Sequence, residues 1–264
     1  MKIWEQFESD CLKYLHNKFN QYATFEGAGG SDSTVSDIKV ITKSNKEYFI
    51  EAKHTPSQCG QFVLIPDESK KQFIFSQLNA SKLTNNVQTI INHMNNNFDL
   101  FLESGTKGTN IIFDSCEDVF ANWVIDYYKN KDTKFIISNN FIILPINKFK
   151  HFFNISGTYR IKKSGSSGVA MSQKDDVIKH LSSLKLKGFK YYYNNGHLDV
   201  FTSDIVDKNT FKIDSNNFMF SKRENNYEIR KLSNTYNANV IFSIDIKDNV
   251  NGLPDQEFIK YLTQ

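Results

Sequence analysis

Two carboxylates and a lysine give residues 36–53 the strongest chemical character in the chain. Asp37 lies at the start of this stretch, and Glu51 and Lys53 lie at its end. Carboxylates are hard oxygen ligands that suit Mg²⁺, an ion that keeps several waters beside one or two protein carboxylates. An ion held in this way polarises a phosphodiester and lowers the pKa of a bound water, and a neighbouring ammonium steers that water or offsets charge at phosphorus. The residue types therefore predict metal-assisted hydrolysis of a phosphate ester.

The same stretch contains the elements that must position these groups. β-forming residues on both sides of the polar segment 43–46 predict two strands joined by a turn. Side chains alternate along a strand, so Glu51 and Lys53 emerge on one face. A turn centred within the polar segment pairs Asp37 with Ala52, within one residue of Glu51. We expect the carboxylates and the ammonium to converge at the end of this hairpin; the alternative is an exposed hairpin with solvated charges.

Ser36-Asp37 and Glu51-Ala52-Lys53 together resemble the signature of the PD-(D/E)XK nuclease superfamily, with Ser36 in place of the usual proline. The resemblance implies a restriction-endonuclease-like mixed β-sheet core flanked by helices. It also implies that Mg²⁺ is held at Asp37, Glu51 and Ala52, and that Lys53 positions or deprotonates the attacking water.

Two further residues are candidates for the same site. Apolar side chains at helical spacing predict a helix over residues 3–19, and Glu8 falls inside the apolar sector, where a carboxylate needs a partner or a metal. Related nucleases often supply an acidic residue from such a helix, so the resemblance makes Glu8 a further metal ligand; a glutamate at the helix boundary is the alternative. Gln61 follows the signature where many relatives carry a glutamine that supports the water or a phosphate. Pro56 and Gly60, which lie between the signature and Gln61, are expected to break the strand.

A basic segment at residues 159–168 is the second informative stretch. Alternation along a strand places Arg160 and Lys162 on one face, and the next residues form a Ser/Gly loop. Arg and Lys bind the guanine edge in the major groove, and hydroxyl and N–H groups suit phosphates. The segment is also similar to segments of restriction endonucleases that approach DNA. We expect DNA contacts here, with a solvated loop as the alternative, from Arg160, Lys162, Lys163, Ser164, Ser166 and Ser167.

The pattern over the whole chain predicts an α/β protein. Strands alternate with helices up to residue 156, which is typical of a mixed sheet covered by helices; residues 68–96 are predicted to be largely helical. The chain from residue 157 onward is rich in predicted strands, including a hairpin around Asn194-Asn195-Gly196. We expect a single endonuclease domain over residues 1–264, in which 1–156 form the catalytic core. Residues 157–264 would form a β-rich part for DNA recognition or dimerisation, with no clean linker.

Composition limits the possible classes of protein. Hydrophobic residues make up 39% of the 264 residues and aromatic residues 14%, which is enough for a core. No apolar run approaches the ~20 residues of a membrane span. The three cysteines are scattered and form neither a disulfide framework nor a zinc pattern, so a cytoplasmic, reducing location is expected. The net charge of +3 permits nucleic-acid binding.

These observations predict a magnesium-dependent type II restriction endonuclease that cuts double-stranded DNA at a short site. By analogy with such enzymes, we expect a homodimer and a cognate DNA methyltransferase as the genetic partner. Two alternatives remain open: a repair or junction-resolving nuclease of the same superfamily, and a DNA-binding module without chemistry.

Overall fold

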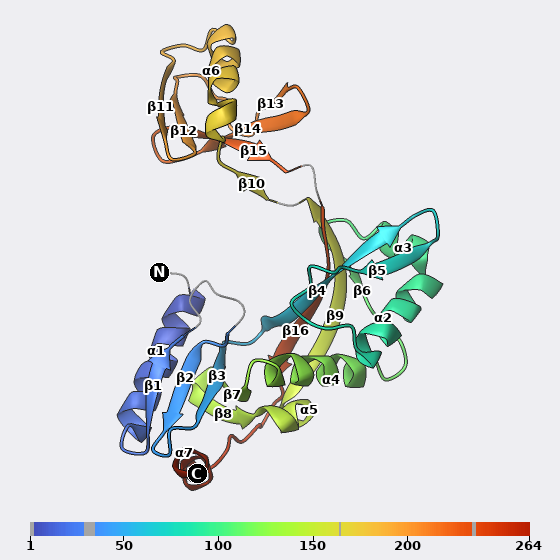
Figure 1. Ribbon diagram of the computed structural model, residues 1–264, viewed down its shortest axis with the longest axis vertical. Helices are drawn as coiled ribbons and strands as arrows, with labels where there is room; N and C mark the ends of the chain where they lie inside the picture. Colours follow the sequence, from blue (N-terminus) through green and yellow to red (C-terminus); the bar gives the residue numbers. More distant parts are fainter. Residues whose placement is uncertain (1–2, 29–34, 164, 234–235) are drawn as a thin grey trace. The chain divides into compact units, whose positions relative to one another are not determined.

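The computed structural model describes residues 3–28, 35–163, 165–233 and 236–264, and only the backbone of Lys162, Lys163, Tyr236 and Asn237. The chain forms two compact units (Figure 1). Unit 1 consists of Met1–Arg160 and Ala238–Gln264, and unit 2 of Ile161–Asn237. The sequence predicted one continuous part from residue 157 onward. The structure instead returns residues 238–264 to unit 1, because they supply a central strand and a core helix there.

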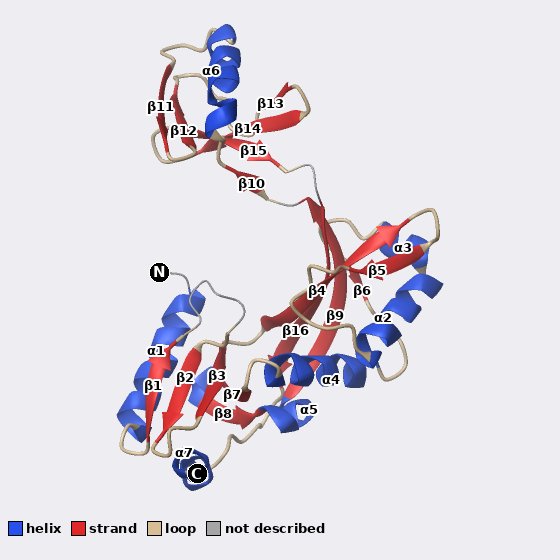
Figure 2. Ribbon diagram, viewed as in Figure 1, coloured by secondary structure: helices blue, strands red, loops and turns tan. Residues whose placement is uncertain are grey.

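The first sheet of unit 1 is mixed. Its five strands lie in the order β1 (Ala23–Gly27), β2 (Ile38–Thr42), β3 (Glu47–Lys53), β7 (Thr133–Ser138) and β8 (Ile142–Pro145). β3 and β7 run parallel and the other neighbours run antiparallel. The predicted mixed sheet flanked by helices is therefore confirmed (Figure 2).

Helices pack on both faces of this sheet. α1 (Ile3–Phe19) and α7 (Asp255–Thr263) share a core with inward-facing side chains of β1, β2 and β3. Leu15 and Phe258 are among the fully buried members of that core. On β3, Ile50 and Ala52 face these two helices, so Glu51 and Lys53 point to the opposite face. That face meets α4 (Cys116–Lys129), whose Tyr128 is fully buried.

The register of the β2–β3 hairpin differs from the prediction by one residue. Ile38 pairs with Ile50 at the end of the ladder, whereas the predicted register would pair Ile38 with Glu51. The predicted register assumed a turn centred on Ser44–Asn45, and the observed turn is one residue shorter. It is shorter because Asn45 adopts a left-handed conformation (φ 58°) and donates its N–H to the Thr42 carbonyl. Ile38 and Ile50 face the core shared with α1 and α7, so the residues next to them, Asp37 and Glu51, lie on the side that carries Lys53.

The second sheet of unit 1 is also five-stranded. Its order is β5 (Gln72–Phe75), β4 (Ser57–Asp67), β16 (Tyr236–Ile246), β9 (Phe153–Lys163) and β6 (Thr109–Asn110). The remaining helical segments of unit 1 are α2 (Asn85–Asn96), α3 (Phe98–Leu102), η1 (Asn139–Phe141), η2 (Ile146–Lys148) and α5 (Phe149–Phe152). The helix predicted over 68–96 is wrong before α2, because Gln72–Phe75 pairs with the end of β4 and buries Phe73.

Gly60 lies inside β4 and does not break it, contrary to the prediction. Its backbone packs against α4, where an added Cβ would lie 2.7 Å from Cζ3 of Trp123. Glycine is therefore required for the close approach of strand and indole rather than for a chain break.

Unit 2 is a small antiparallel sheet with one helix. Its strands lie in the order β11 (Lys190–Asn194), β12 (His197–Phe201), β15 (Tyr227–Leu232), β14 (Asn216–Lys222) and β13 (Thr210–Ile213), and β10 (Ser166–Ser167) pairs with β15. η3 (Met171–Gln173) precedes α6 (Lys174–Ser183), which buries Val177 and Leu181 against the sheet. The predicted β11–β12 hairpin is confirmed.

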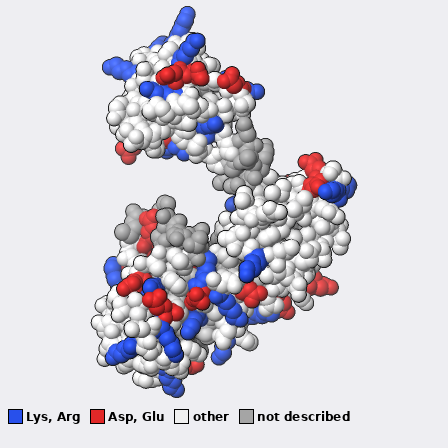
Figure 3. Space-filling model, in the orientation of Figure 1, with Lys and Arg blue, Asp and Glu red and all other residues white. Residues whose placement is uncertain are grey.

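In the part of the chain that is described, no helix combines the length and apolar character that crossing a membrane requires. On the displayed face of unit 1, basic and acidic side chains are interspersed, with no large field of one sign (Figure 3).

Candidate active site

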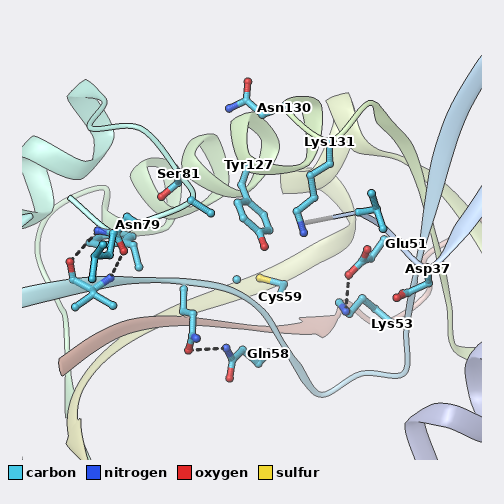
Figure 4. A pocket seen from close by; sticks show the side chains of 17 residues that line it. Asp37, Glu51, Lys53, Gln58, Cys59, Asn79, Ser81, Tyr127, Asn130 and Lys131 are labelled. Carbon is cyan, nitrogen blue, oxygen red and sulfur yellow. Dashed lines mark hydrogen bonds and ion pairs between the residues drawn. The ribbon is translucent and has the colours of Figure 1, made fainter. Parts of the chain in front are cut away.

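The structure brings Asp37, Glu51 and Lys53 into one pocket. This pocket has a volume of about 620 Å³ and lies between the end of the β2–β3 hairpin, β4 and the end of α4 (Figure 4). Its lining also includes Gln58 and Gln61 of β4. Four of the sequence-predicted residues, Asp37, Glu51, Lys53 and Gln61, therefore share a cavity large enough for a phosphodiester and its neighbouring groups.

Glu51 and Lys53 form a tight ion pair. The Lys53 Nζ lies 2.6 Å from Glu51 Oε1, and only 9% of the Glu51 side chain is exposed. Tyr128 of α4 donates its hydroxyl to the carbonyl of Cys59 at 2.9 Å and lies 3.3 Å from the same Glu51 oxygen. The Glu51 carboxylate is thus held by the Lys53 ammonium from its own strand and by the Tyr128 hydroxyl from α4.

The charged form of Asp37 is disfavoured by burial and by a neighbouring carboxylate. Its Oδ2 accepts a hydrogen bond from the Ala52 N–H at 2.9 Å, which ties the start of β2 to β3. Burial, reinforced by the Glu51 charge, raises the pKa of Asp37 to about 7 in spite of Lys53 and the Ala52 N–H, which act to lower it. A buried carboxyl group whose pKa is raised by a neighbouring carboxylate belongs to a site whose electrostatic energy falls when a cation enters.

Lys53 is an ammonium in this environment. Burial disfavours its charge, but the neighbouring Glu51 and Asp37 carboxylates outweigh burial and raise the pKa of Lys53 above its ordinary value. A permanently charged lysine orients a nucleophile or offsets developing negative charge, and it is poorly suited to accept a proton.

Glu8 of α1 interacts electrostatically with Lys53 and Glu51. Burial raises the pKa of Glu8, and among charged groups Lys53 lowers it while Glu51 raises it. Among the residues that the structure describes, no group of three or more His, Cys, Asp or Glu side chains is placed to hold a metal. In the described structure, Asp37 and Glu51 are thus two neighbouring carboxylates without a third grouped beside them.

This donor set fits Mg²⁺. Mg²⁺ takes one or two carboxylates and completes its shell with water and substrate phosphate oxygens, whereas structural zinc requires four protein ligands. The pair of carboxylates that lines the pocket satisfies the first pattern. Ala52, the intervening residue of the motif, lies on β3 outside the pocket lining, and its carbonyl as a ligand stays a prediction.

Gln61 lies in the same pocket for a reason that the sequence did not reveal. The ladder between β4 and β16 pairs Gln58 with Ser243 and Gly60 with Phe242, which leaves Cys59 as an unpaired, bulged residue. A bulge shifts the alternation of side chains, so Gln58 and Gln61, three positions apart, meet through a hydrogen bond of 3.1 Å. The two amides form one wall of the pocket.

Several lining residues were missed at the sequence level. Tyr127 lies in the last turn of α4, and Asn130 and Lys131 lie directly after the helix; the Lys131 Nζ is 4.3 Å from the centre of the Tyr127 ring. Figure 4 shows Lys131 beside Glu51 and Tyr127 along the pocket. Residues of the β5–α2 connection complete the wall: Leu78, Asn79, Ala80 and Ser81. The sequence offered only the helical pattern of α4, which predicts core packing and no orientation toward Glu51.

Cys59 lines the pocket as a buried residue. Burial raises the pKa of its thiol above the ordinary value. The thiol donates a hydrogen bond to the Phe242 carbonyl, with an Sγ–O distance of 3.5 Å. A buried thiol whose pKa is raised is a poor nucleophile.

The predicted DNA-contact residues fall in different parts of the chain. Arg160 lies on β9, half-buried, and its Nε is buried without a hydrogen-bond partner in the described structure. In unit 2, Ser166 accepts hydrogen bonds from Arg230 through its hydroxyl at 3.2 Å and its carbonyl at 2.7 Å, and Ser167 is exposed. The side chains of Lys162 and Lys163, and all of Ser164, lie outside the described residues.

Comparison with known proteins gives one strong match. No family model matches the chain. A MATH and LRR domain-containing protein of Plasmodium falciparum (isolate 3D7) is 22% identical over 225 residues, or 79% of this chain, but the chain spans only 2% of that protein's length. A solved structure of the HhaI endonuclease in complex with DNA is 37% identical, with a TM-score of 0.78, and the match covers 99% of both chains. Because this similarity extends over practically the whole of both proteins, the chain belongs to the same family as the HhaI endonuclease.

Proposed function

We propose that this protein is a magnesium-dependent endonuclease that hydrolyses phosphodiester bonds of double-stranded DNA at a short specific site, as type II restriction endonucleases do. The observation that carries the proposal is the joint placement of Asp37, Glu51 and the Lys53 ammonium in one open pocket. The full-length similarity to an endonuclease solved in complex with DNA supports the same substrate.

Each residue of the pocket has a distinct role in this proposal. Asp37, Glu51 and the Ala52 carbonyl would hold Mg²⁺, which when bound polarises a phosphate oxygen and lowers the pKa of a water. Lys53 orients the attacking water and offsets the negative charge that grows on the phosphate oxygens. The Gln58–Gln61 pair lies where it can donate amide hydrogens to that water or to a phosphate oxygen.

The reaction is an in-line displacement at phosphorus. The water oxygen forms a bond to phosphorus as the bond to the 3′ oxygen breaks. One water proton is transferred through solvent or phosphate oxygens, and the 3′ oxygen leaves as a hydroxyl, so that a 5′-phosphate remains. The Lys53 ammonium keeps its proton throughout, because the two carboxylates stabilise its charge.

The test is digestion of phage DNA by the purified protein with Mg²⁺ and with EDTA. Discrete fragments that require Mg²⁺ are expected, and sequencing of their ends gives the site and the 5′-phosphate. Lys53→Ala should abolish cleavage while DNA binding, measured by gel shift, persists. Intact DNA in the presence of Mg²⁺ would contradict the proposal, and a smear would contradict its site-specific part.

Partners and assembly remain predictions within this proposal. A homodimer would supply two pockets for the two strands, and a cognate methyltransferase would protect the host DNA. Sedimentation of the protein with and without its duplex distinguishes one copy from two at each site.

A further inference from the structure

The most exposed large apolar side chain of the described structure lies at the mouth of the pocket. Leu78 has 95% of its surface exposed, and it lines the same cavity as Asp37, Glu51 and Lys53. It belongs to the connection between β5 and α2, which passes along the wall formed by β4.

A dense set of hydrogen bonds holds Leu78 in this exposed position. The Asn79 side chain binds the backbone of Val63 on β4 twice: its Oδ1 accepts from the Val63 N–H at 2.7 Å and its Nδ2 donates to the Val63 carbonyl at 3.0 Å. Ser76, which is buried, accepts the Leu78 N–H through its hydroxyl and the Asn79 N–H through its carbonyl, each at 3.2 Å. The turn is thus fixed on both sides of a side chain that contacts almost nothing.

Covering this leucine would add favourable free energy. Burying a leucine side chain is worth roughly 1.5–3 kcal/mol relative to leaving it in water, and a polar residue would satisfy this turn equally well. A fixed, fully exposed leucine beside a phosphodiester-cleaving centre is suited to an apolar surface on the substrate. In a DNA duplex that surface is offered by the bases, and leucine is among the side chains that insert at base steps from the minor groove.

We propose that Leu78 packs against the bases of the DNA duplex at a step next to the cleaved phosphate and unstacks that step. This inference rests on the proposed endonuclease function. Asn79 and Ser76 act as positioning residues, because they fix the turn that carries the leucine. The contact draws the flanking phosphate into the pocket and adds affinity that is insensitive to salt, in contrast to contacts with the phosphates.

The test compares Leu78→Ala and Leu78→Gln with Leu83→Ala in the full-length protein. Leu83 is a matched control because it is 54% exposed and lies in the same connection, but it is not part of the pocket lining. The duplex carries the mapped cleavage site, with 2-aminopurine placed in turn at each step that flanks the cleaved phosphate. Binding and 2-aminopurine fluorescence are measured in EDTA, and cleavage is measured in Mg²⁺.

Wild type and Leu83→Ala should raise the 2-aminopurine fluorescence at one step and cut at equal rates. Both Leu78 variants should lose that signal, and kcat/KM should fall by about tenfold, as expected for the loss of one buried leucine contact. Leu78 variants that match Leu83→Ala in fluorescence or in cleavage would overturn the inference. If the Leu78 variants instead sediment differently from wild type and bind DNA equally well, Leu78 serves self-association and the inference also fails. If wild type cuts no DNA, the proposed function fails; if wild type cuts and the Leu78 variants cut equally well, only this inference fails.

Discussion

The Tyr128 hydroxyl lies 3.3 Å from Glu51 Oε1, although the two residues are 77 positions apart in the chain. The same hydroxyl donates to the Cys59 carbonyl at 2.9 Å. Tyr128 therefore joins α4 to β3 and to the bulge of β4, and it limits the positions that the Glu51 carboxylate can take.

Tyr128→Phe should weaken Mg²⁺ binding more than it weakens the fold. Loss of the hydroxyl frees the Glu51 carboxylate, and loss of a hydrogen bond that orients a metal ligand costs about tenfold in metal affinity. The free energy of unfolding should fall by about 1 kcal/mol. Calorimetric titration of Mg²⁺ and urea denaturation measure the two effects separately.

Tyr159→Phe is the matched control for this prediction. Tyr159 is also fully buried, and its hydroxyl donates to a backbone carbonyl, that of Leu64, at 3.1 Å. The control should lose similar stability and keep the Mg²⁺ affinity of wild type. Equal Mg²⁺ affinities in both variants would show that Tyr128 has only a structural role.

The sequence predicted the parts of the fold that depend on local chemistry. The alternation of Glu51 and Lys53 and the turn at Asn195-Gly196 were read correctly, because strand period and turn residues are local properties. The register of β2 and β3 was predicted one residue out, because it depends on the left-handed conformation of Asn45, which the sequence permits without requiring.

Features that depend on distant contacts could not be predicted. Gly60 was read as a chain break because nothing local shows that Trp123 packs on its backbone. Gln72–Phe75 is too short for its period to identify a strand. Tyr128 and Leu78 have ordinary helical and loop surroundings in the sequence, and only the assembled pocket shows that one contacts Glu51 and the other is left exposed.

Gly60→Ala should destabilise unit 1. The new Cβ would lie 2.7 Å from Trp123 Cζ3 and 3.0 Å from Cη2, so the strand or the indole must move. Overpacking of this kind costs about 1–3 kcal/mol, which urea denaturation measures. Gly165→Ala is the control, since an added Cβ there meets no atom within 4 Å. Equal stability of the two variants would contradict the close packing of β4 on α4.

Glu228 should make the stability of unit 2 dependent on pH. Its buried carboxylate is paired with Arg230 at 2.7 Å, with His197 at 2.9 Å and with Arg223. Burial acts to raise the pKa of Glu228, but the hydrogen bonds from these three groups outweigh it and lower the pKa to about 2. Because the pKa of Glu228 is lower in the folded protein than the value of about 4.5 in the unfolded chain, its charge stabilises the fold. This stabilisation is complete above pH 4.5 and is lost as the pH falls toward 2.

Glu228→Gln should therefore lower stability by on the order of 2 kcal/mol at pH 7 and by less at pH 3. Urea denaturation followed by circular dichroism at the two pH values measures the difference. Glu224→Gln removes an exposed carboxylate nearby and should have little effect at either pH. A Glu228→Gln effect that is the same size at pH 3 as at pH 7 would contradict the lowered pKa.

The last prediction concerns Glu8, which the sequence proposed as a metal ligand. Its carboxylate interacts with the site through charge, and the described structure holds no third carboxylate grouped with Asp37 and Glu51. Glu8→Gln should therefore lower Mg²⁺ affinity by no more than about threefold, because only a screened charge is removed. Asp37→Asn, which removes a proposed ligand, should lower it by tenfold or more. Glu5→Gln, one turn earlier on α1, controls for the charge of the helix. Calorimetric titration of Mg²⁺ decides the matter: a Glu8→Gln loss as large as that of Asp37→Asn would make Glu8 a direct ligand, brought to the ion by a movement of α1.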